Sequence, residues 1–186
     1  MQVLAGDIGG TKTLLAVCEV VWQADALRID VLASKRYDSR QYPGLGVICR
    51  EFAAELGQKL PPLAGFGIAG PVAGGRSHTT NLPWIVDARD LARTLGISSV
   101  RLANDFHALA LGISSVKPRD LVTLNEGARD ADGACAVLGA GTGLGEAILV
   151  GPEGAREVIA TEGGHATFAP RTEMEIGILR FLMQRH

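Results

Sequence analysis

One short pattern occurs twice in the chain, and this repeat decides the fold. Residues 7–17 read DIGGTKTLLAV, and residues 139–150 read GAGTGLGEAILV. In each copy an apolar run leads into glycines and a threonine and a second apolar run follows, which predicts a β-hairpin with a wide, glycine-built turn. Either copy alone could be a plain glycine-rich turn. Two copies roughly 130 residues apart favour a pair of related phosphate-binding hairpins, because internal self-similarity is a property of a whole fold.

The residues of the two turns suit the phosphates of a nucleotide. Glycine lets several backbone N–H groups approach one anionic oxygen, and a threonine hydroxyl adds another donor. Asp7 lies beside the first turn, where a carboxylate close to phosphates requires a divalent cation between them. We therefore predict a metal ligand at Asp7 and nucleotide contacts from seven residues: Asp7, Gly9, Gly10, Thr11, Gly141, Thr142 and Gly143.

Composition and charge disfavour several other classes of protein. With 47% hydrophobic and 20% charged residues, the chain can bury a core. A formal net charge of −2 argues against nucleic acid as the main partner. No segment approaches the roughly 18 consecutive apolar residues that span a bilayer, so no membrane association is expected. The N-terminus runs directly into a predicted strand without a basic leader, which favours a cytoplasmic location.

Cysteine and histidine give no support for a structural metal site. The cysteines, Cys18, Cys49 and Cys135, are far apart and flanked mostly by apolar residues, as is typical of buried thiols. The histidines show no spacing that pairs them with a cysteine or with each other.

Hydrophobic periodicity predicts alternating strands and helices in the first part of the chain. Strands are expected at 3–8, 13–21, 29–36, 63–69 and 100–103, and helices at 46–56, after Asp87 up to Gly96, and at 105–111. The strand at 63–69 is apolar on both faces, so a central place in the sheet is expected. The pattern weakens around 112–119. We therefore predict a first domain over 1–114 and a second over 115–186.

The second domain begins like the first. Strands are expected at 121–124, 134–138 and 147–150, and Thr172 with Glu175 forms a capping box for a last helix. A domain that has formed only its first strands and one helix has not closed a core. The chain is therefore expected to be interrupted, with apolar surface left exposed.

Five stretches together resemble the bacterial glucokinase family, within the actin-like ATPase (ribonuclease H-like) superfamily of sugar kinases. They are GDIGGTKTLLAV at Gly6, GIAGPV at Gly67, ANDFHALALGI at Ala103, LGAGTGLGEAIL at Leu138 and TEGGHATFAP at Thr161. They cover the whole chain in the family's order. The resemblance implies an α/β fold: an actin-like lobe with a mixed five-stranded sheet and helices, followed by the start of a second, similar lobe.

The resemblance also implies a reaction and its partners. The expected activity is phosphorylation of the 6-hydroxyl of glucose by ATP with Mg2+, in a cleft between two lobes and usually in a homodimer. The zinc-binding cysteine cluster of the related repressor and kinase group is absent, which favours the glucokinase group proper. The chain ends before the family's remaining sugar-ligand glutamate and its adenosine-binding segment. We therefore expect these 186 residues alone to be inactive.

Asp105 is the predicted proton acceptor for the attacking sugar hydroxyl. It lies at a strand-to-helix junction, where a cleft residue of such a lobe belongs, and a positioned base contributes roughly 10²–10⁴-fold to rate. Asn104, Asp105, Glu162 and His165 are the predicted sugar ligands, since hydroxyls are bound by groups that accept or donate hydrogen bonds. By resemblance, Asn104, Glu162 and His165 match sugar ligands of the family. The alternative is that Asn104 and Asp105 only cap the following helix.

A second class of function stays open at this point. A short relative that keeps the hydroxyl-binding residues but lacks half of the nucleotide site would be a non-catalytic sugar-binding or regulatory module. A DNA-binding repressor of the wider superfamily is disfavoured, because no helix-turn-helix precedes Val3. Continuation of the reading frame beyond His186 would favour the kinase.

Overall fold

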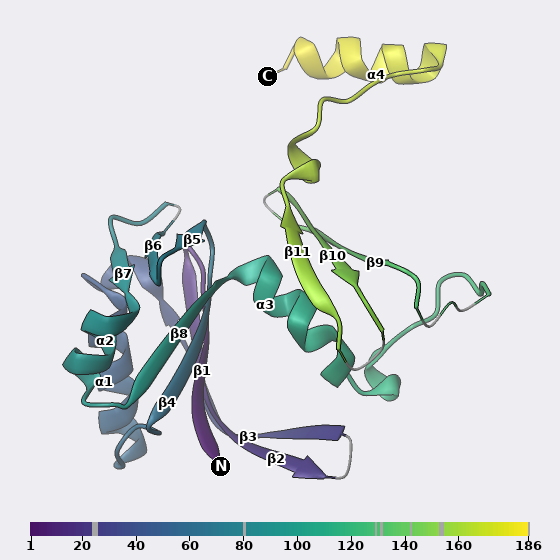
Figure 1. The fold of residues 1–186 in the computed structure, drawn as a ribbon. Helices are drawn as coiled ribbons and strands as arrows, with labels where there is room; N and C mark the ends of the chain where they lie inside the picture. The colour runs from purple at the N-terminus through teal and green to yellow at the C-terminus, as the bar shows by residue number, and fades with distance from the viewer. Residues whose placement is uncertain are drawn as a thin grey trace.

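The computed structural model describes residues 1–23, 26–79, 81–128, 130, 132–141, 143–152 and 155–185. Two sheets, formed by the first and the last parts of the chain, lie on either side of helix α3 (Figure 1). The strands are β1 (Gln2–Ile8), β2 (Lys12–Gln23), β3 (Ala26–Asp38), β4 (Leu63–Ile68), β5 (Val72–Ala73), β6 (Arg76–His78), β7 (Ile85–Asp87), β8 (Ser99–Asn104), β9 (Cys135–Ala140), β10 (Leu144–Val150) and β11 (Glu157–Thr161). The helices are α1 (Leu45–Leu56), α2 (Ala88–Leu95), α3 (Asp105–Gly112) and α4 (Glu173–Met183), with short 3-10 turns η1 (Ser39–Gln41), η2 (Ile113–Ser115), η3 (Pro118–Asp120) and η4 (Gly163–His165).

The first sheet has five strands in the order β3-β2-β1-β4-β8. Strands β1, β2 and β3 run antiparallel, whereas β1, β4 and β8 run parallel to one another. The expected α/β class and mixed five-stranded sheet are therefore confirmed. The parallel strands place their carboxyl ends at one edge of the sheet, beside the β1–β2 turn.

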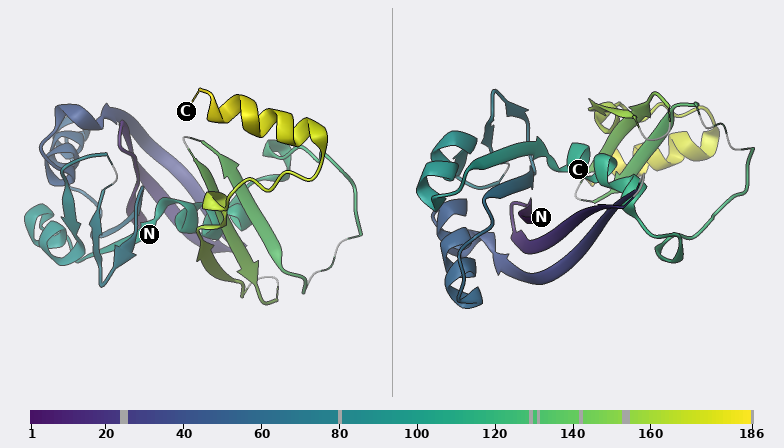
Figure 2. Two further views of the ribbon diagram at one scale, coloured as in Figure 1. Left: turned by 90° about the horizontal axis from the view of Figure 1, so that it is seen from above. Right: turned by 60° about the horizontal axis from the view of Figure 1, so that its bottom comes forward.

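Helices α1 and α2 pack on one face of this sheet and close the main core there. Leu4, Ile8, Leu15 and Phe66 point into a core that α1 and α2 close with Ile48, Phe52 and Leu91. Figure 2 shows both helices on that side of the sheet. Strand β4 lies inside the sheet as expected. Only one of its faces is buried, since Ala64, Phe66 and Ile68 are buried while Leu63 and Gly65 are exposed.

The ends of α1 and α2 follow the sequence signals. The Oδ1 of Asp87 accepts the backbone N–H groups of Arg89 at 2.9 Å and Asp90 at 3.1 Å. Each helix ends at a glycine with a left-handed backbone, Gly57 at φ 63 and Gly96 at φ 65. Other residues pay a steric cost there, which is why glycine marks both ends.

Strands β5, β6 and β7 form a small antiparallel sheet that the sequence pattern did not predict. They have only two or three residues each, and β6 consists of Arg76, Ser77 and His78. Strands of two or three residues are too short to give a hydrophobic periodicity. Trp84 anchors the connection between β6 and β7, because its side chain is buried and its Nε1 donates to the carbonyl of Tyr42 at 3.1 Å.

The second sheet is antiparallel, in the order β11-β10-β9. Its small core contains Val137, Ala147 and Leu149 together with Ala110 of α3. Strand β11 was not predicted, and the predicted strand at 121–124 is wrong. That segment pairs with no strand in the described part of the chain, and Val122 and Leu124 are 84% and 95% exposed. Its short apolar run is buried by no neighbour within the described ranges.

Helix α4 begins with the predicted capping box. The Thr172 Oγ1 accepts the N–H of Glu175 at 3.3 Å, and the Glu175 Oε2 accepts the N–H of Thr172 at 3.0 Å. The apolar side chains Ile178 and Phe181 of this helix are 46% and 51% exposed, consistent with the expected exposed apolar surface.

Helix α3 contacts strands of both sheets, namely β4, β8, β10 and β11. It therefore lies between the parts assigned to residues 1–114 and 115–186, and that division stays a prediction. Cys18 and Cys49 are buried as expected, but Cys135 is only half-buried. No helix in the described residues is long and apolar enough to span a membrane.

Candidate active site

The edge of the first sheet brings Asp7 next to the end of β8. In register, Asp7 pairs with Leu14 on one side and with Gly67 on the other, and Gly67 pairs with Ala103. Gly67 allows α3 to approach closely, since a Cβ at this position would lie 3.4 Å from the Cα of Asp105. The sheet thus places two carboxylates, Asp7 and Asp105, on either side of a glycine.

The charge of Asp105 acts on the carboxyl group of Asp7. Burial raises the pKa of the Asp7 carboxyl above its ordinary value, the charge of Asp105 raises it further, and the Arg36 guanidinium lowers it in part. Repulsion between two nearby carboxylates is what a divalent cation relieves. Within the described residues, no group of three or more histidine, cysteine or acidic side chains could hold a metal ion. A pair of carboxylates suits Mg2+, which is usually bound by one or two carboxylates together with phosphates and water.

Asn104 caps α3, which is the helix-capping role considered as the alternative in the sequence analysis. Its Oδ1 accepts the N–H groups of Phe106 at 3.0 Å and His107 at 3.1 Å, and its Nδ2 donates to the carbonyl of Gly70 at 3.1 Å. An amide has two acceptor sites and two donor hydrogens, so one N–H remains for a ligand. Asp105 Oδ1 accepts the Phe106 N–H at 2.8 Å, which leaves the other carboxylate oxygen for a further partner.

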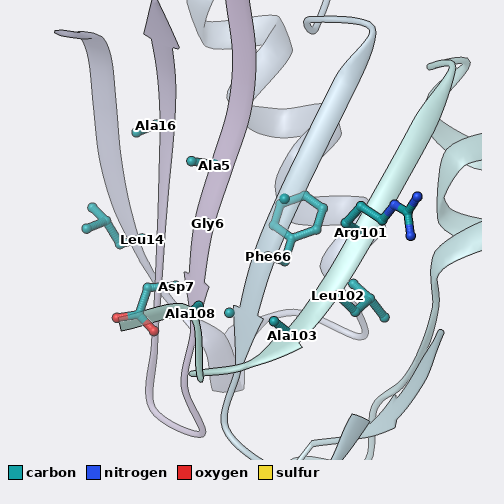
Figure 3. A pocket seen from close by; sticks show the side chains of 12 residues that line it. Ala5, Gly6, Asp7, Leu14, Ala16, Phe66, Arg101, Leu102, Ala103 and Ala108 are labelled. Carbon is teal, nitrogen blue, oxygen red and sulfur yellow. The ribbon is translucent and has the colours of Figure 1, made fainter. Parts of the chain in front are cut away.

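A hollow of about 410 Å³ lies beside these residues, on the sheet face opposite α1 and α2 (Figure 3). Small residues from four strands form much of its lining, with Asp7 from β1 and Ala108 from α3. Asp7 is the candidate site residue that lines this largely apolar hollow, and Ala103 brings the hollow to the end of β8, next to Asn104. Clefts of this kind with a few polar groups are typical of ligand sites.

The first glycine turn connects β1 to β2 and contains Gly9, Gly10 and Thr11. The N–H of Gly9 donates to the carbonyl of Lys12 at 2.9 Å, which closes the turn. The turn lies directly after Asp7 and Ile8, so the predicted nucleotide residues of the first hairpin are near the carboxylate pair.

The second glycine turn connects β9 to β10, as the repeated pattern predicted. Its ends approach each other, since the N–H of Gly141 donates to the carbonyl of Gly143 at 2.8 Å. Thr142, the third predicted residue of this turn, lies outside the described residues.

Phe106 connects the Asn104–Asp105 junction to this second hairpin. Gly139 and Gly145 are cross-strand partners on β9 and β10, and the Phe106 ring lies against both. A Cβ on Gly139 would lie 2.6 Å from Phe106 Cε2, and one on Gly145 would lie 2.5 Å from the same atom. Phe106 follows Asp105 directly, so the position of Asp105 depends on the second hairpin. The sequence analysis did not identify Phe106, because only long-range packing defines its role.

The predicted sugar residues Glu162 and His165 lie in and just before η4, after β11. The backbone of this turn packs on β10: Gly163 lies against the Glu146 carboxylate, and Gly164 against the carbonyl of Leu144. The side chains of Glu162 and His165 are 89% and 76% exposed, and His165 Nδ1 lies 3.9 Å from Glu162 Oε2. The η4 turn is therefore held next to the second glycine turn. The sequence analysis also did not identify Glu146 as a contact of this turn.

The predicted residues thus form two groups. Asp7, the first glycine turn, Asn104 and Asp105 lie at the edge of the first sheet. Gly141, Gly143, Glu162 and His165 lie on the second sheet. Among the described residues, no hydrogen bond or ion pair links Glu162 or His165 to Asn104 or Asp105.

Comparisons with known proteins find relatives over almost the whole chain. A sequence model of the family "Glucokinase" matches residues 4–186. The glucokinase of Nostoc punctiforme is 38% identical over 183 residues, which cover 98% of this chain and 53% of that protein. The chain spans about half the length of the curated relatives it matches.

Two solved structures extend the comparison. The crystal structure of a glucokinase from an Antarctic psychrotroph has a TM-score of 0.83 and 27% identity, covering 100% of this chain and 57% of that one. A glucokinase of the ROK family from Streptomyces griseus, in complex with glucose and AMPPNP, has a TM-score of 0.55 and 25% identity, covering 91% of this chain and 52% of that one. The match of the family model over almost the entire chain shows that this chain belongs to the glucokinase family.

Proposed function

We propose that the chain supplies the first lobe and the beginning of the second lobe of an ATP-dependent glucokinase. The reaction is transfer of the γ-phosphoryl group of ATP to the 6-hydroxyl of glucose. The observation that carries the proposal is that the sheet register and the close approach of α3 to Gly67 bring Asp7 and Asp105 together beside the glycine turn of β1 and β2. Family membership and the glucose and AMPPNP bound by the Streptomyces griseus relative support the choice of substrates.

Asp105 accepts the proton of the attacking hydroxyl. The sugar oxygen forms a bond to the γ-phosphorus as the bond from that phosphorus to the bridging oxygen of ATP breaks, so ADP leaves and the proton moves to the carboxylate. One Oδ of Asp105 already accepts the N–H of Phe106, which fixes the carboxylate while the other oxygen faces the substrate. Asn104 offers its remaining N–H to a sugar hydroxyl.

Backbone N–H groups of the two glycine turns bind the phosphates of ATP. Gly9, Gly10 and Thr11 belong to the first turn, and Gly141, Thr142 and Gly143 to the second. Asp7 would hold the Mg2+, whose charge offsets that of the phosphates. The raised pKa of the Asp7 carboxyl fits this role, since a carboxylate crowded by Asp105 gains most from a bound cation.

Glu162 and His165 complete the sugar site from the second lobe. Both side chains are exposed to solvent, so they can contact a sugar in a cleft between the lobes. A carboxylate accepts from two adjacent hydroxyls, and an imidazole can donate or accept. Asn104 and Asp105 then contact the sugar from the first lobe, and Glu162 and His165 contact it from the second.

The assembly and the location also belong to the proposal. We expect a cytoplasmic homodimer, with neither nucleic acid nor a membrane as partner. Size-exclusion chromatography with light scattering tests the dimer, and a monomer at micromolar concentration would contradict it.

Activity is tested in a longer protein. The full-length form is this chain joined to the part of the Nostoc punctiforme glucokinase that this chain does not cover. A coupled assay with ATP and a panel of hexoses should show formation of glucose 6-phosphate above a heat-killed control. A tenfold or greater preference in kcat/KM for another hexose would overturn glucose as the substrate.

The same assay on the 186-residue chain alone separates the kinase from the alternative. We expect no turnover, because the chain spans only about half the length of the curated relatives it matches. Glucose binding without turnover in both the chain and the full-length form would instead favour a non-catalytic sugar-binding or regulatory module. Turnover by the 186-residue chain, abolished by Asp105→Asn, would contradict its expected inactivity and uphold the role of Asp105.

A further inference from the structure

A turn that binds phosphate must keep its own carbonyl oxygens away from the ligand. Each peptide unit of the β1–β2 turn carries an N–H donor and a C=O acceptor. A phosphate oxygen is attracted by the N–H groups and repelled by the carbonyls. The turn therefore needs partners within the protein that hold its carbonyls on the side away from the phosphates.

Ser39, at the start of η1, is bonded to two of these carbonyls. Its Oγ donates to the carbonyl of Gly9 at 2.9 Å, and its backbone N–H donates to the carbonyl of Thr11 at 3.0 Å. The Ser39 side chain is fully buried. With Gly9 N–H bonded to the carbonyl of Lys12, the carbonyls of Gly9, Thr11 and Lys12 all have donors inside the protein.

Thr13 fixes the direction of the Ser39 hydroxyl. The two buried hydroxyl oxygens lie 2.9 Å apart. Each hydroxyl has one hydrogen, and that of Ser39 is used on the carbonyl of Gly9, so Thr13 must donate to Ser39. Loss of either hydroxyl would leave a buried polar group without its partner.

The neighbouring Arg40 orients the hydroxyl of Thr11 through a hydrogen bond. Its Nη2 donates to the Thr11 Oγ1 at 3.2 Å. A guanidinium has no acceptor, so the Thr11 oxygen accepts and its own hydrogen stays available for a phosphate. The η1 turn thus donates hydrogen bonds to three atoms of the glycine turn: the carbonyl oxygens of Gly9 and Thr11 and the Oγ1 of Thr11.

We propose that Ser39 is a positioning residue for the nucleotide phosphates, holding the Gly9–Lys12 turn with the carbonyls of Gly9 and Thr11 turned away and the turn's remaining N–H groups presented. The inference rests on the proposed kinase function. It goes beyond the residues of the glycine motif, since Ser39 lies 30 positions from Gly9 and reaches it only through the fold. Its effect on ATP is exerted through the turn.

The first test compares two buried serines in the full-length form. Ser39→Ala should raise the KM for ATP about tenfold, the consequence of losing one hydrogen bond of ordinary strength, and should change the KM for glucose less than about twofold. Ser77→Ala is the matched control. Ser77 is also buried, but its Oγ has no hydrogen-bond partner among the described residues and lies in β6, outside the turn. The Ser77→Ala variant should leave the KM for ATP and the KM for glucose within about twofold of the wild type.

Thr13 provides a second pair of variants, should Ser39→Ala fold poorly. Thr13→Val keeps the shape and removes the hydroxyl, so it should raise the KM for ATP as Ser39→Ala does. Thr13→Ser keeps the hydroxyl and should restore the wild-type value. An unchanged KM for ATP in both Ser39→Ala and Thr13→Val, or an equal rise in the KM for ATP and glucose, would overturn the inference.

A measurement on the 186-residue chain separates this inference from the proposed function. Amide hydrogen exchange of Gly9, whose N–H closes the turn, should become at least about tenfold faster in Ser39→Ala and stay unchanged in Ser77→Ala. If the wild-type full-length form does not phosphorylate glucose, the proposed function fails. Unchanged exchange at Gly9 in Ser39→Ala would overturn the positioning role by itself.

Discussion

The contact between Phe106 and the Gly139–Gly145 pair makes a sharp prediction. Replacing Gly145 by alanine would place a Cβ 2.5 Å from Phe106 Cε2 and 3.0 Å from Cγ. Carbon atoms in contact stay about 3.5–4.0 Å apart, so the ring has to move by about 1 Å. Because Phe106 is in the first turn of α3, its displacement also shifts Asp105.

The size of the effect follows from the cost of overpacking. Inserting a methyl group into a filled contact destabilises a fold by about 1–3 kcal/mol. For a chain of this length about 1 kcal/mol lowers Tm by about 2–4 °C, so Gly145→Ala should lower it by about 2–12 °C. Gly143→Ala is the control, since a Cβ at that position of the same hairpin meets nothing within 4 Å. Its effect should stay within about 0.5 kcal/mol.

A double-mutant cycle assigns the effect to the ring. Thermal unfolding is followed by circular dichroism for the wild type, Gly145→Ala, Phe106→Ala and the double variant. Without the ring the added methyl group meets no obstacle, so Gly145→Ala should have almost no effect in the Phe106→Ala background, and the coupling energy should be about 1–3 kcal/mol. An equal loss of stability in both backgrounds would refute the reasoning.

Three further predictions concern single side chains. Glu162→Gln removes a charged acceptor for sugar hydroxyls, so in the full-length form the KM for glucose should rise by the equivalent of about 1.5–3 kcal/mol with little change in kcat; an effect confined to kcat would be inconsistent with a binding role. Because burial and Asp105 raise the pKa of Asp7, the ionised carboxylate opposes folding at neutral pH. Asp7→Asn should therefore unfold at a higher temperature than the wild type at pH 7, and this difference should shrink as the pH falls towards the ordinary value of 3.8; a lower melting temperature at pH 7 would contradict the assigned electrostatics. Thr172→Ala removes the N-cap of α4 and should destabilise that helix by about 0.5–2 kcal/mol, visible as faster amide exchange at Glu175, whereas unchanged exchange would show that the cap contributes little.

Local signals in the sequence were sufficient for much of the fold and for part of the site. The Asp87 cap, the glycines after α1 and α2 and the Thr172 capping box act within a few residues, and the structure confirms each of them. The junction at Asn104 and Asp105 was located for the same reason. The structure adds that Asn104 caps α3 with its oxygen, which leaves one amide hydrogen for a sugar.

Features that depend on distant parts of the chain were not predictable. The apolar run at 121–124 looks like a strand, yet a strand requires a neighbour, and periodicity does not report one. Ser39 and Phe106 are ordinary residues in the sequence. Their roles arise because β3 ends beside the first glycine turn and α3 lies against the second hairpin. The predicted roles of Glu162 and His165 as sugar ligands stay predictions.

The role of Asp105 is the central claim, and Asp105→Asn in the full-length form tests it most directly. The amide keeps the shape of the side chain but cannot accept the proton, so kcat should fall by at least about 10²-fold. Glucose affinity, measured by calorimetry, should stay within about threefold of the wild type, since most hydrogen bonds are retained. A variant that keeps a kcat within tenfold of the wild type would contradict the account.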